Sequence, residues 1–529
     1  MASFALAVIV VLTAVAVSGQ RPNVLFLLSD DLGYGEVGAM RQGHANLNTN
    51  ISTPNIDLLM ASGIRFTNFY ANAECSVSRG SLMTGKHSGH ATIRNNNGPS
   101  LGPADATFVE TLAANGYKTS CIGKWHLVGQ SNMRSNPAGA PWNKGCQRAF
   151  IPEDSGWMYP TDRVYRYDAA AGGLKELTFP VNAGASRGRC MAAGNTCVWL
   201  TDLTLTESLA ELSFHANRQA KEKTEGKTPA PFFLYLAWSE PHTGYWDALN
   251  QDTRGNPVPG DGGFGGKPWP TVEKDHAAAI TLWHDVYVKK VMDKLTQLGL
   301  RNNTIVIYAS DNGASDETLD NGGHKGAFFK SSGPLRGYKL HLTDGGIRVP
   351  ATVSWPGKIA TGAVCDTPIA IWDLAPTILD LASVPKAGWT AGMDGVSLYG
   401  SLFLQPKLAT GKVAPAVGFV HPPLYWERCS NGRGNRPSWS FSRKGTAFSR
   451  AIRDGPWKGV QLFQAGEYSD VKLFNMAVDI YETTNVAKAS AANVATAARL
   501  KALLNSMRTS AAGGFSYPPT DACTDVYGK

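Results

Sequence analysis

The sequence predicts an α/β fold: a large mixed, mostly parallel sheet between helices, followed by a smaller C-terminal α+β domain. Three observations support this prediction: strand-length apolar runs, helix-length segments between them, and polar residues directly after the runs. Short, continuous apolar runs are typical of strands that are buried on both faces of a sheet. The predicted strands are Asn23–Ser29, Lys118–Ile122, Phe232–Trp238 and Thr304–Ser310.

Helices are predicted between and after these strands. The segment Asp202–Lys221 is amphipathic, because leucines recur along one of its sides. Gly116 and Gly299 each follow a helical segment, at the position where glycine commonly ends a helix. The predicted helices of the large domain are Thr107–Asn115, Asp202–Lys221, Ala277–Leu298 and Pro368–Leu381.

The chain divides into a leader and two domains. Residues 1–19 have an apolar run, Ala5–Val17, that is too short to span a bilayer and ends in small residues typical of signal-peptide cleavage. We therefore predict a signal peptide at 1–19. The strand–helix alternation ends around Asp394–Leu398, which predicts a large α/β domain at 20–404 and an α+β domain at 405–529 with a helix at Ala491–Met507. The segment Trp142–Trp199 has little periodicity and is predicted to be a long loop region near the active-site cleft.

Composition and charge narrow the class of function. The chain has 529 residues, a net charge of +8 and no later segment of transmembrane length, so we expect a soluble, secreted protein; a lysosomal location stays open. A basic protein suits anionic substrates, but the scattered basic residues argue against nucleic-acid binding. Asn50 and Asn302 begin glycosylation sequons, which predict a glycoprotein where the host glycosylates.

Eight cysteines are present, and one of them, Cys75, lies in a segment suited to chemistry. Cys190 and Cys197 flank a Gly-Asn turn and are the best local candidates for a disulfide bond. Cys121 lies in a predicted strand and is expected to be a buried free thiol. The sequence does not determine how the others pair; they are Cys146, Cys365, Cys429 and Cys523.

Polar residues follow two of the predicted strands and together form a set of hard oxygen ligands. Asp30 and Asp31 follow the first strand, and Asp311 and Asn312 follow the last. Taken alone, each pair is more often a helix cap or a tight turn. Ligands bind at the carboxyl edge of open α/β sheets, so we expect the four side chains to converge there and hold Ca²⁺ or Mg²⁺.

Cations and imidazoles follow the other two strands. Lys124 is suited to binding a tetrahedral oxyanion, and His126 to accepting a proton from a nucleophile. His242, after Pro241, is suited to protonating a leaving oxygen. Lys339 is distinguished only by its spacing to the turn at Gly345. In isolation, a surface lysine is the commoner role for Lys124 and Lys339, and a hydrogen-bonded histidine for His126. For His242, a structural role in the loop is as common as a catalytic one.

The segment Cys75–Gly85 is the most informative in the chain. It places a cysteine on a turn that runs into a helix, with Arg79 one turn further along. The start of a helix offers free N–H groups and a positive dipole end, and arginine has a planar fork for oxyanions. The segment therefore predicts a nucleophile facing an anionic substrate.

This segment resembles the sulfatase signature Cys-x-Pro-Ser-Arg-x-x-x-x-Thr-Gly. Six motifs in the family's order, spanning residues 22 to about 400, support a resemblance to the sulfatases of the alkaline phosphatase superfamily, such as arylsulfatases and N-acetylgalactosamine-6-sulfatases. The resemblance implies an alkaline phosphatase-like sandwich. The motifs are Pro22–Leu25 with Asp30 and Asp31, Cys75–Gly85, Gly123–Leu127, Pro241–His242, Ser310–Gly313 and Gly345–Pro350.

The resemblance implies a Ca²⁺-dependent enzyme in which a formylglycine-generating enzyme oxidises Cys75 to formylglycine (3-oxoalanine), whose hydrate attacks a sulfate ester. The Ca²⁺ ligands would be Asp30, Asp31, Asp311, Asn312 and the modified Cys75. The implied roles of the other residues are orientation of the hydrate by Arg79, sulfate binding by Lys124 and Lys339, leaving-group protonation by His242 and proton removal by His126.

Two residues depart from the family's pattern. Val77 stands where the proline recognised by the formylglycine-generating enzyme is usual, and Asp344 replaces a glutamate before the Gly-Gly turn.

Two other functions stay open: a phosphatase or phosphonate monoester hydrolase of the same superfamily, and a catalytically inactive, secreted carbohydrate-binding homologue. Lys124 and Lys339 argue against a second metal and so against the phosphatase.

The expected substrate is a sulfated carbohydrate or an aryl sulfate, and the loops at 130–200 and 243–275 are expected to select it together with the C-terminal domain. Aromatic side chains in these loops would stack on sugar or aryl rings, or pack locally. They are Trp142, Trp157, Tyr159, Tyr245 and Trp246.

Overall fold

The computed structural model describes most of the chain after the predicted leader. The described residues are 20–42, 50–96, 98–129, 133, 137–152, 163–179, 198–242, 258–260, 262–316, 324–430, 447–464 and 467–508. The predicted signal peptide at 1–19 lies outside them. No helix among the described residues is long and apolar enough to cross a membrane.

A ten-stranded mixed sheet forms the centre of the molecule, in the order β11-β2-β10-β9-β1-β8-β4-β5-β6-β7. The five strands from β9 to β5 are parallel, and antiparallel strands lie on both sides of them. The predicted fold class is confirmed, as are the four predicted strands. The strands are β1 Asn23–Ser29, β2 Ile64–Phe66, β4 Lys118–Gly123, β5 Arg148–Pro152, β6 Arg163–Asp168, β7 Gly173–Thr178, β8 Phe232–Ala237, β9 Thr304–Ser310, β10 Ala351–Ser354 and β11 Ala363–Cys365.

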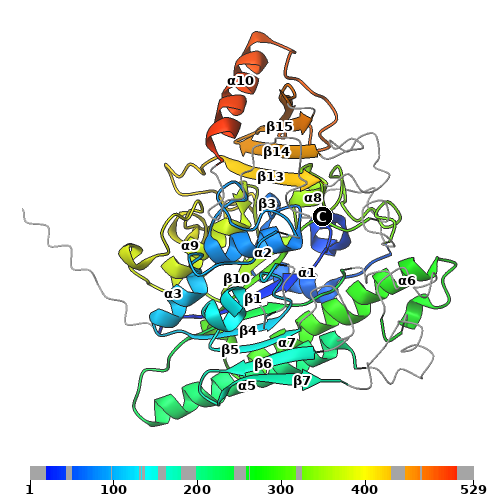
Figure 1. Ribbon diagram of the computed structural model, residues 1–529. Helices are drawn as coiled ribbons and strands as arrows, with labels where there is room; N and C mark the ends of the chain where they lie inside the picture. Colours follow the sequence, from blue (N-terminus) through cyan, green and yellow to red (C-terminus); the bar gives the residue numbers. More distant parts are fainter. Residues whose placement is uncertain are drawn as a thin grey trace, which may run out of the picture.

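Helices cover both faces of this sheet, because successive side chains of its strands point to opposite sides. Along β1, Phe26 and Leu28 belong to one apolar core, while Leu25 and Leu27 belong to the other. Helices α2, α3 and α9 cover the first face, and α5 and α7 the second (Figure 1). Their bounds are α2 Cys75–Thr84, α3 Phe108–Ala114, α5 Leu200–Thr224, α7 Asp285–Gln297 and α9 Leu374–Leu381.

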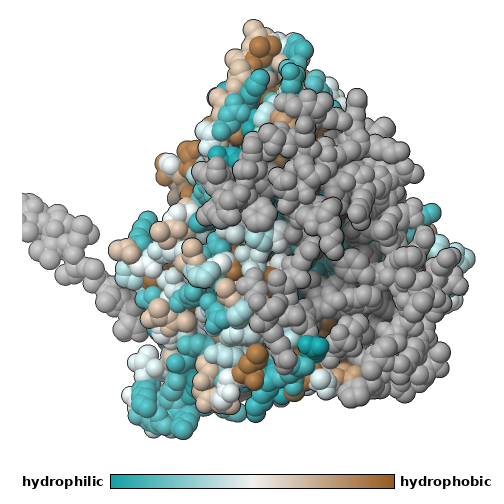
Figure 2. Space-filling view, viewed as in Figure 1, coloured by the Kyte–Doolittle hydropathy of each residue, from teal (hydrophilic) through white to brown (hydrophobic). Residues whose placement is uncertain are grey.

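Two predicted helices begin earlier than the sequence indicated. Helix α5 starts at Leu200, and its last turn carries the exposed Lys221. The corresponding lower left of the surface is hydrophilic (Figure 2). The helix predicted from Ala277 starts with α6 (Thr271–Ala278), which a π-helical turn joins to α7. A shorter helix, α1 (Pro54–Ala61), packs against α7.

The C-terminal region forms a separate antiparallel sheet with one helix, as the α+β prediction requires. Helix α10 packs on this sheet at the top of Figure 1 by burying Leu500 and Leu504. The sheet docks on the large domain through Trp426, whose indole N–H donates to the carbonyl of Ala71 at 2.8 Å. The elements are β13 Leu424–Ser430, β14 Ala447–Asp454, β15 Trp457–Gln464, β16 Glu467–Tyr468, β17 Lys472–Asn475 and α10 Ala491–Ser506.

The prediction that Trp142–Trp199 is a loop region was wrong for its described part. Strands β5, β6 and β7 lie there and extend the large sheet. The outer strands expose much of their surface, so they carry charged residues rather than the apolar runs of buried strands. Arg163 of β6 pairs with Glu176 of β7, for example.

The prediction of a free thiol at Cys121 was also wrong, because Cys121 forms a disulfide bond with Cys146. Strand β4 carries Cys121 and Cys146 lies just before β5, its parallel neighbour, so the two Cα atoms are 5.8 Å apart. Cys75 and Cys365 are buried free cysteines. Cys190, Cys197 and Cys523 lie outside the described residues.

Candidate active site

Four neighbouring parallel strands end at the same edge of the large sheet and bring the predicted site residues together. Backbone hydrogen bonds join the segments that follow them: Asp311 N to the Ser29 carbonyl at 3.1 Å, and Asp30 N to the Glu240 carbonyl at 3.1 Å. Lys124 N donates to the carbonyl of Ala237 at 2.9 Å. The edge is therefore a continuous, hydrogen-bonded floor rather than a set of separate loops.

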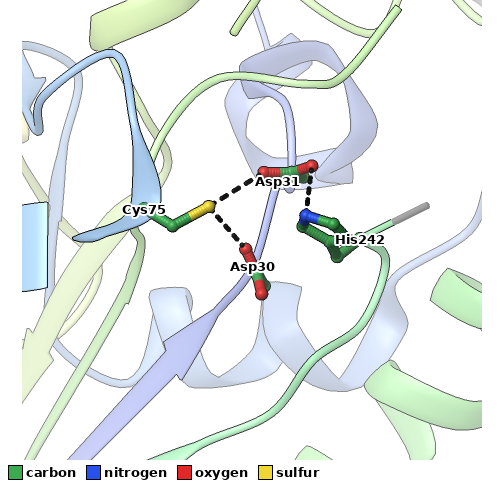
Figure 3. Close-up of side chains that lie close together, drawn as sticks. All are labelled: Asp30, Asp31, Cys75 and His242. Carbon is green, nitrogen blue, oxygen red and sulfur yellow. Dashed lines mark hydrogen bonds and ion pairs between the residues drawn. The ribbon is translucent and has the colours of Figure 1, made fainter. Parts of the chain in front are cut away.

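Cys75 is the first residue of α2, and its side chain points toward Asp30 and Asp31 at this edge of the sheet (Figure 3). Its Sγ lies 3.3 Å from Asp30 Oδ1 and 3.7 Å from Asp31 Oδ1. Burial, together with the negative charges of Asp30 and Asp311, raises the pKa of the Cys75 thiol well above its usual value. The unmodified cysteine is thus a protonated thiol, which is a poor nucleophile.

Arg79 lies one turn further along α2, fully buried, and connects three parts of the site. Its Nε and one terminal nitrogen donate to Asp311 Oδ2 at 3.0 and 2.7 Å. The other terminal nitrogen donates to the Lys124 carbonyl at 2.8 Å and to the Tyr235 hydroxyl at 3.1 Å. Sequence reasoning missed Tyr235, because one tyrosine in the apolar strand β8 has no distinguishing signal.

The four residues predicted to hold a metal lie in one buried group. Asn312 Nδ2 donates to Asp31 Oδ1 at 2.7 Å, which leaves Asn312 Oδ1 buried without a hydrogen-bond partner. Burial and repulsion from Asp30 raise the pKa of Asp311 to about 6. A buried cation would satisfy the free oxygen and reduce this repulsion, so the residues fit a hard divalent ion such as Ca²⁺.

Two lysines place positive charge beside these carboxylates. Lys124 hydrogen-bonds Asp30 Oδ2, and Lys339 Nζ lies 2.9 Å from Asp31 Oδ2. Burial favours the neutral form of Asp31, but the charges of Lys339 and His242 outweigh it and hold the pKa of Asp31 well below its usual value. The site therefore combines fixed anions and fixed cations within one buried volume.

The two histidines differ in their surroundings. His242 Nε2 lies 3.8 Å from Asp31 Oδ2 (Figure 3). The same nitrogen lies 3.2 Å from Lys339 Nζ. His126 has a left-handed backbone, with φ of 58°, and its Nδ1 is buried without a hydrogen-bond partner. Burial and the charges of Lys124 and Arg79 lower the pKa of His126 well below its usual value, so the ring is in the neutral form that a proton acceptor requires.

The Gly-Gly turn after Lys339 packs directly against the Asn312 loop. A Cβ atom on Gly313 would lie 1.9 Å from the Gly345 carbonyl oxygen, so only glycine permits this approach. Lys339 N donates to the carbonyl of Ala314 at 2.8 Å. The spacing between Lys339 and the turn thus has a structural reason: both ends hold the loop that carries Asn312.

Of the aromatic residues predicted to contact substrate, only Trp142 is described. It is half-buried and stacks on Tyr167 at 5.6 Å between ring centroids, so it packs locally. The others lie outside the described residues, namely Trp157, Tyr159, Tyr245 and Trp246.

Comparison with known proteins identifies the family to which this chain belongs. Residues 22–384 match the sulfatase family. The chain is 30% identical to human arylsulfatase A over 76% of its own length and 71% of that protein, and 29% identical to human N-acetylgalactosamine-6-sulfatase over 83% and 76%. The crystal structure of Ps i-CgsB in complex with k-i-k-neocarrahexaose shares the fold, with a TM-score of 0.66, 22% identity and coverage of 93% and 94%.

The chain therefore belongs to the sulfatase family of the alkaline phosphatase superfamily. It is a sulfuric ester hydrolase, and its substrates are sulfate esters.

Proposed function

We propose that the protein hydrolyses the sulfate esters of carbohydrates, using formylglycine derived from Cys75 and one Ca²⁺ ion. The observation that carries this proposal is the position of Cys75: its Sγ faces Asp30 and Asp31 from the start of a helix, yet its thiol is held protonated. Conversion of the side chain to an aldehyde hydrate would place a hydroxyl nucleophile at the same point. The names of N-acetylgalactosamine-6-sulfatase and of the carrahexaose complex support a sugar substrate.

The side chains around residue 75 would have separate roles in substrate binding and in proton transfer. Lys124 and Lys339 would bind sulfate oxygens and stabilise the negative charge that develops on them. His242, beside Lys339, would protonate the leaving oxygen of the sugar. His126 would take a proton from a hydroxyl of residue 75, since its ring is neutral.

Arg79 would act as an orienting group rather than a proton donor. Its guanidinium is already held by Asp311, the Lys124 carbonyl and Tyr235, so its direction toward residue 75 is set before substrate binds. The Ca²⁺ ligands would be Asp30, Asp31, Asp311, Asn312 and residue 75, and the ion would supply Lewis-acid stabilisation of sulfate charge.

Mass spectrometry of the tryptic peptide Phe66–Arg79 tests the modification at its site. We expect the mass of formylglycine at residue 75 in protein made with a formylglycine-generating enzyme, and release of sulfate from a sulfated sugar by the same sample. A matched sample of Cys75→Ala should release none. An unmodified thiol in an active sample would contradict the proposed nucleophile, whereas an unmodified thiol in an inactive sample would show that Val77 prevents maturation.

A phosphate ester of the same sugar separates the proposal from phosphatase activity. Because Lys124 and Lys339 pair with Asp30 and Asp31, these positions hold cations rather than ligands for a second metal. We expect the sulfate ester to be hydrolysed with the higher kcat/KM. Faster hydrolysis of the phosphate ester would favour the phosphatase instead.

We also propose that the protein is exported through the secretory pathway. The apolar leader at 1–19 supports this, and so does the Cys121–Cys146 disulfide bond, since such bonds persist in oxidising compartments. Sequencing the N-terminus of protein recovered from the medium tests it; a chain retained in cells with Met1 intact would contradict export.

A further inference from the structure

A second group of ligand-type side chains lies outside the proposed catalytic machinery. It consists of Glu36, at the end of the 3-10 turn Tyr34–Glu36, His276 in α6, and His324, all of them buried. His276 Nε2 lies 2.6 Å from Glu36 Oε1, and His324 Nε2 lies 3.6 Å from the same oxygen. The two imidazole rings stack with centroids 3.4 Å apart, at 14° between their planes.

The negative charge of Glu36 needs a compensating cation. Its Oε2 accepts a hydrogen bond from Gly33 N at 2.7 Å, and its Oε1 faces only the two imidazoles. No lysine or arginine of the described chain forms an ion pair with it, although the charge of Arg41 interacts with it at longer range. A buried carboxylate without a paired charge is costly, so either a proton shared with His276 or a bound metal ion must supply the charge.

The geometry distinguishes these two sources. A proton-mediated pair needs one imidazole, whereas here a second one, His324, also places its Nε2 3.6 Å from this oxygen. That nitrogen hydrogen-bonds Ser331 Oγ at 3.0 Å, and a bound metal ion would replace this hydrogen bond. Metal–ligand distances of about 2.0–2.1 Å put neighbouring ligand atoms roughly 3.0–3.4 Å apart, and the observed 2.6 and 3.6 Å bracket that range. Two imidazole nitrogens with one carboxylate oxygen form a set typical of Zn²⁺ and other divalent transition metals, unlike the hard-oxygen set around Asp30 and Asp31.

We propose that Glu36, His276 and His324 bind a Zn²⁺ ion that is separate from the catalytic metal. Its role is structural, because it joins three segments of the chain. Gly35 N donates to the Ser331 carbonyl at 2.8 Å, and a Cβ on Gly33 would lie 2.2 Å from that oxygen, so the turn before Glu36 is pressed against the segment after His324.

These segments lead directly to the active site. The turn containing Gly33 follows Asp31, and the segment after His324 runs on to Lys339. Asp31 and Lys339 pair with each other at 2.9 Å. The metal therefore holds together the two segments whose ends supply one anion and one cation to the floor of the site.

Metal analysis of the full-length protein tests the site without relying on activity. Purified protein, stripped with a chelator, would be equilibrated with Zn²⁺ in excess Ca²⁺ and its metal content measured by mass spectrometry. We expect about one Zn²⁺ per chain for the wild type, and loss of it in His276→Gln and His324→Gln. The matched control is His90→Gln, which makes the same change in another histidine–carboxylate pair, His90–Asp394, and should keep the Zn²⁺.

Replacement of Zn²⁺ by Co²⁺ supplies a second readout on the wild type alone, in case a variant does not fold. Imidazole ligation in a four-coordinate site gives strong visible absorption, which an all-oxygen site lacks, and thermal unfolding should shift upward with the metal. Another transition metal lost in both variants would support the site and change its occupant. Wild-type protein without transition metal, or Zn²⁺ lost only in His90→Gln, would overturn the proposal.

Discussion

Two buried ionic clusters lie at either end of the turn that follows Lys339: the proposed catalytic cluster around Asp30, Asp31 and Asp311, and an interface cluster around Asp344 and Glu482. Both contain paired charges, and they differ in which polar atoms are left without a hydrogen bond. The catalytic cluster keeps unused polar atoms: Asn312 Oδ1 and His126 Nδ1 are buried without hydrogen-bond partners. The interface cluster joins the two domains through Lys458, whose Nζ lies 2.7 Å from Asp344 Oδ1 and 2.8 Å from Glu482 Oε1.

Several groups of the interface cluster form hydrogen bonds or ion pairs with Asp344. Its backbone N–H donates to Glu482 Oε2 at 2.6 Å, and its Oδ2 accepts from the Tyr70 hydroxyl at 2.9 Å. Arg453 hydrogen-bonds the same hydroxyl. Asp344, the residue that departs from the family's glutamate, is therefore well suited to this docking. Glu482 Oε1 also accepts no hydrogen bond, but it lies 2.8 Å from the charge of Lys458. The comparison shows that the proposed catalytic cluster leaves an uncharged oxygen and an uncharged nitrogen available to a ligand, whereas the interface cluster compensates its unbonded oxygen with a neighbouring charge.

Lys339→Met should give the largest effect, in the catalytic cluster. Removal of the ammonium group leaves Asp31 with less positive charge and removes a proposed sulfate-binding group, so we expect kcat to fall by roughly 10²–10³-fold. Steady-state kinetics on a sulfated sugar measure this, with thermal unfolding as the check on folding. A folded variant with unchanged kcat would remove Lys339 from the proposed mechanism.

Lys458→Met is the matched change in the interface cluster and should act on stability instead. It leaves Asp344 and Glu482 buried without their shared cation, which should lower the free energy of unfolding by about 3–5 kcal/mol. Denaturant unfolding measures this loss. The kcat per folded molecule should change far less than in Lys339→Met; an equal loss of kcat in both variants would erase the distinction between the clusters.

Much of the fold was predictable, because buried parallel strands and amphipathic helices each have a repeating pattern. Strand β1 and helix α5 are examples. The strands β6 and β7 were not, since their exposed, charged residues resemble a loop. The grouping of the site residues followed from where the strands end. Contacts between distant segments had no local signal, and the interface of Lys458 with Asp344 is one of them.

The disulfide bond is another contact without a local sequence signal, because Cys121 and Cys146 meet only through the parallel pairing of β4 and β5. Replacing both cysteines with alanine should lower the free energy of unfolding by about 2–4 kcal/mol, since the bond closes a loop with a sequence separation of 25. Unfolding in denaturant, compared with Cys365→Ala as a control that breaks no bond, measures this. A loss no larger than that of the control would show that the bond contributes little.

The pH dependence of stability gives the finest test of the interface cluster. Burial raises the pKa of Glu482 to about 7 from an ordinary value of 4.5; repulsion from Asp344 adds to this, and Lys458 acts against it. Because the folded state holds this proton more tightly than the unfolded state, the contribution of Glu482 to stability falls as the pH rises from 4.5 to about 7. The full change is at most about 3 kcal/mol.

Glu482→Gln should remove this pH-dependent loss of stability. The difference in the free energy of unfolding between wild type and variant should therefore change with pH from 4.5 to about 7. His87 acts in the opposite direction, since burial lowers its pKa to about 4, but it does so equally in both proteins and cancels. Unfolding in denaturant at several pH values measures the difference, with the exposed Glu467→Gln in the same sheet as the control. If the difference stays constant from pH 4.5 to about 7, Glu482 is ionised throughout, and Lys458 pairs with two full negative charges rather than with one carboxylate and one carboxylic acid.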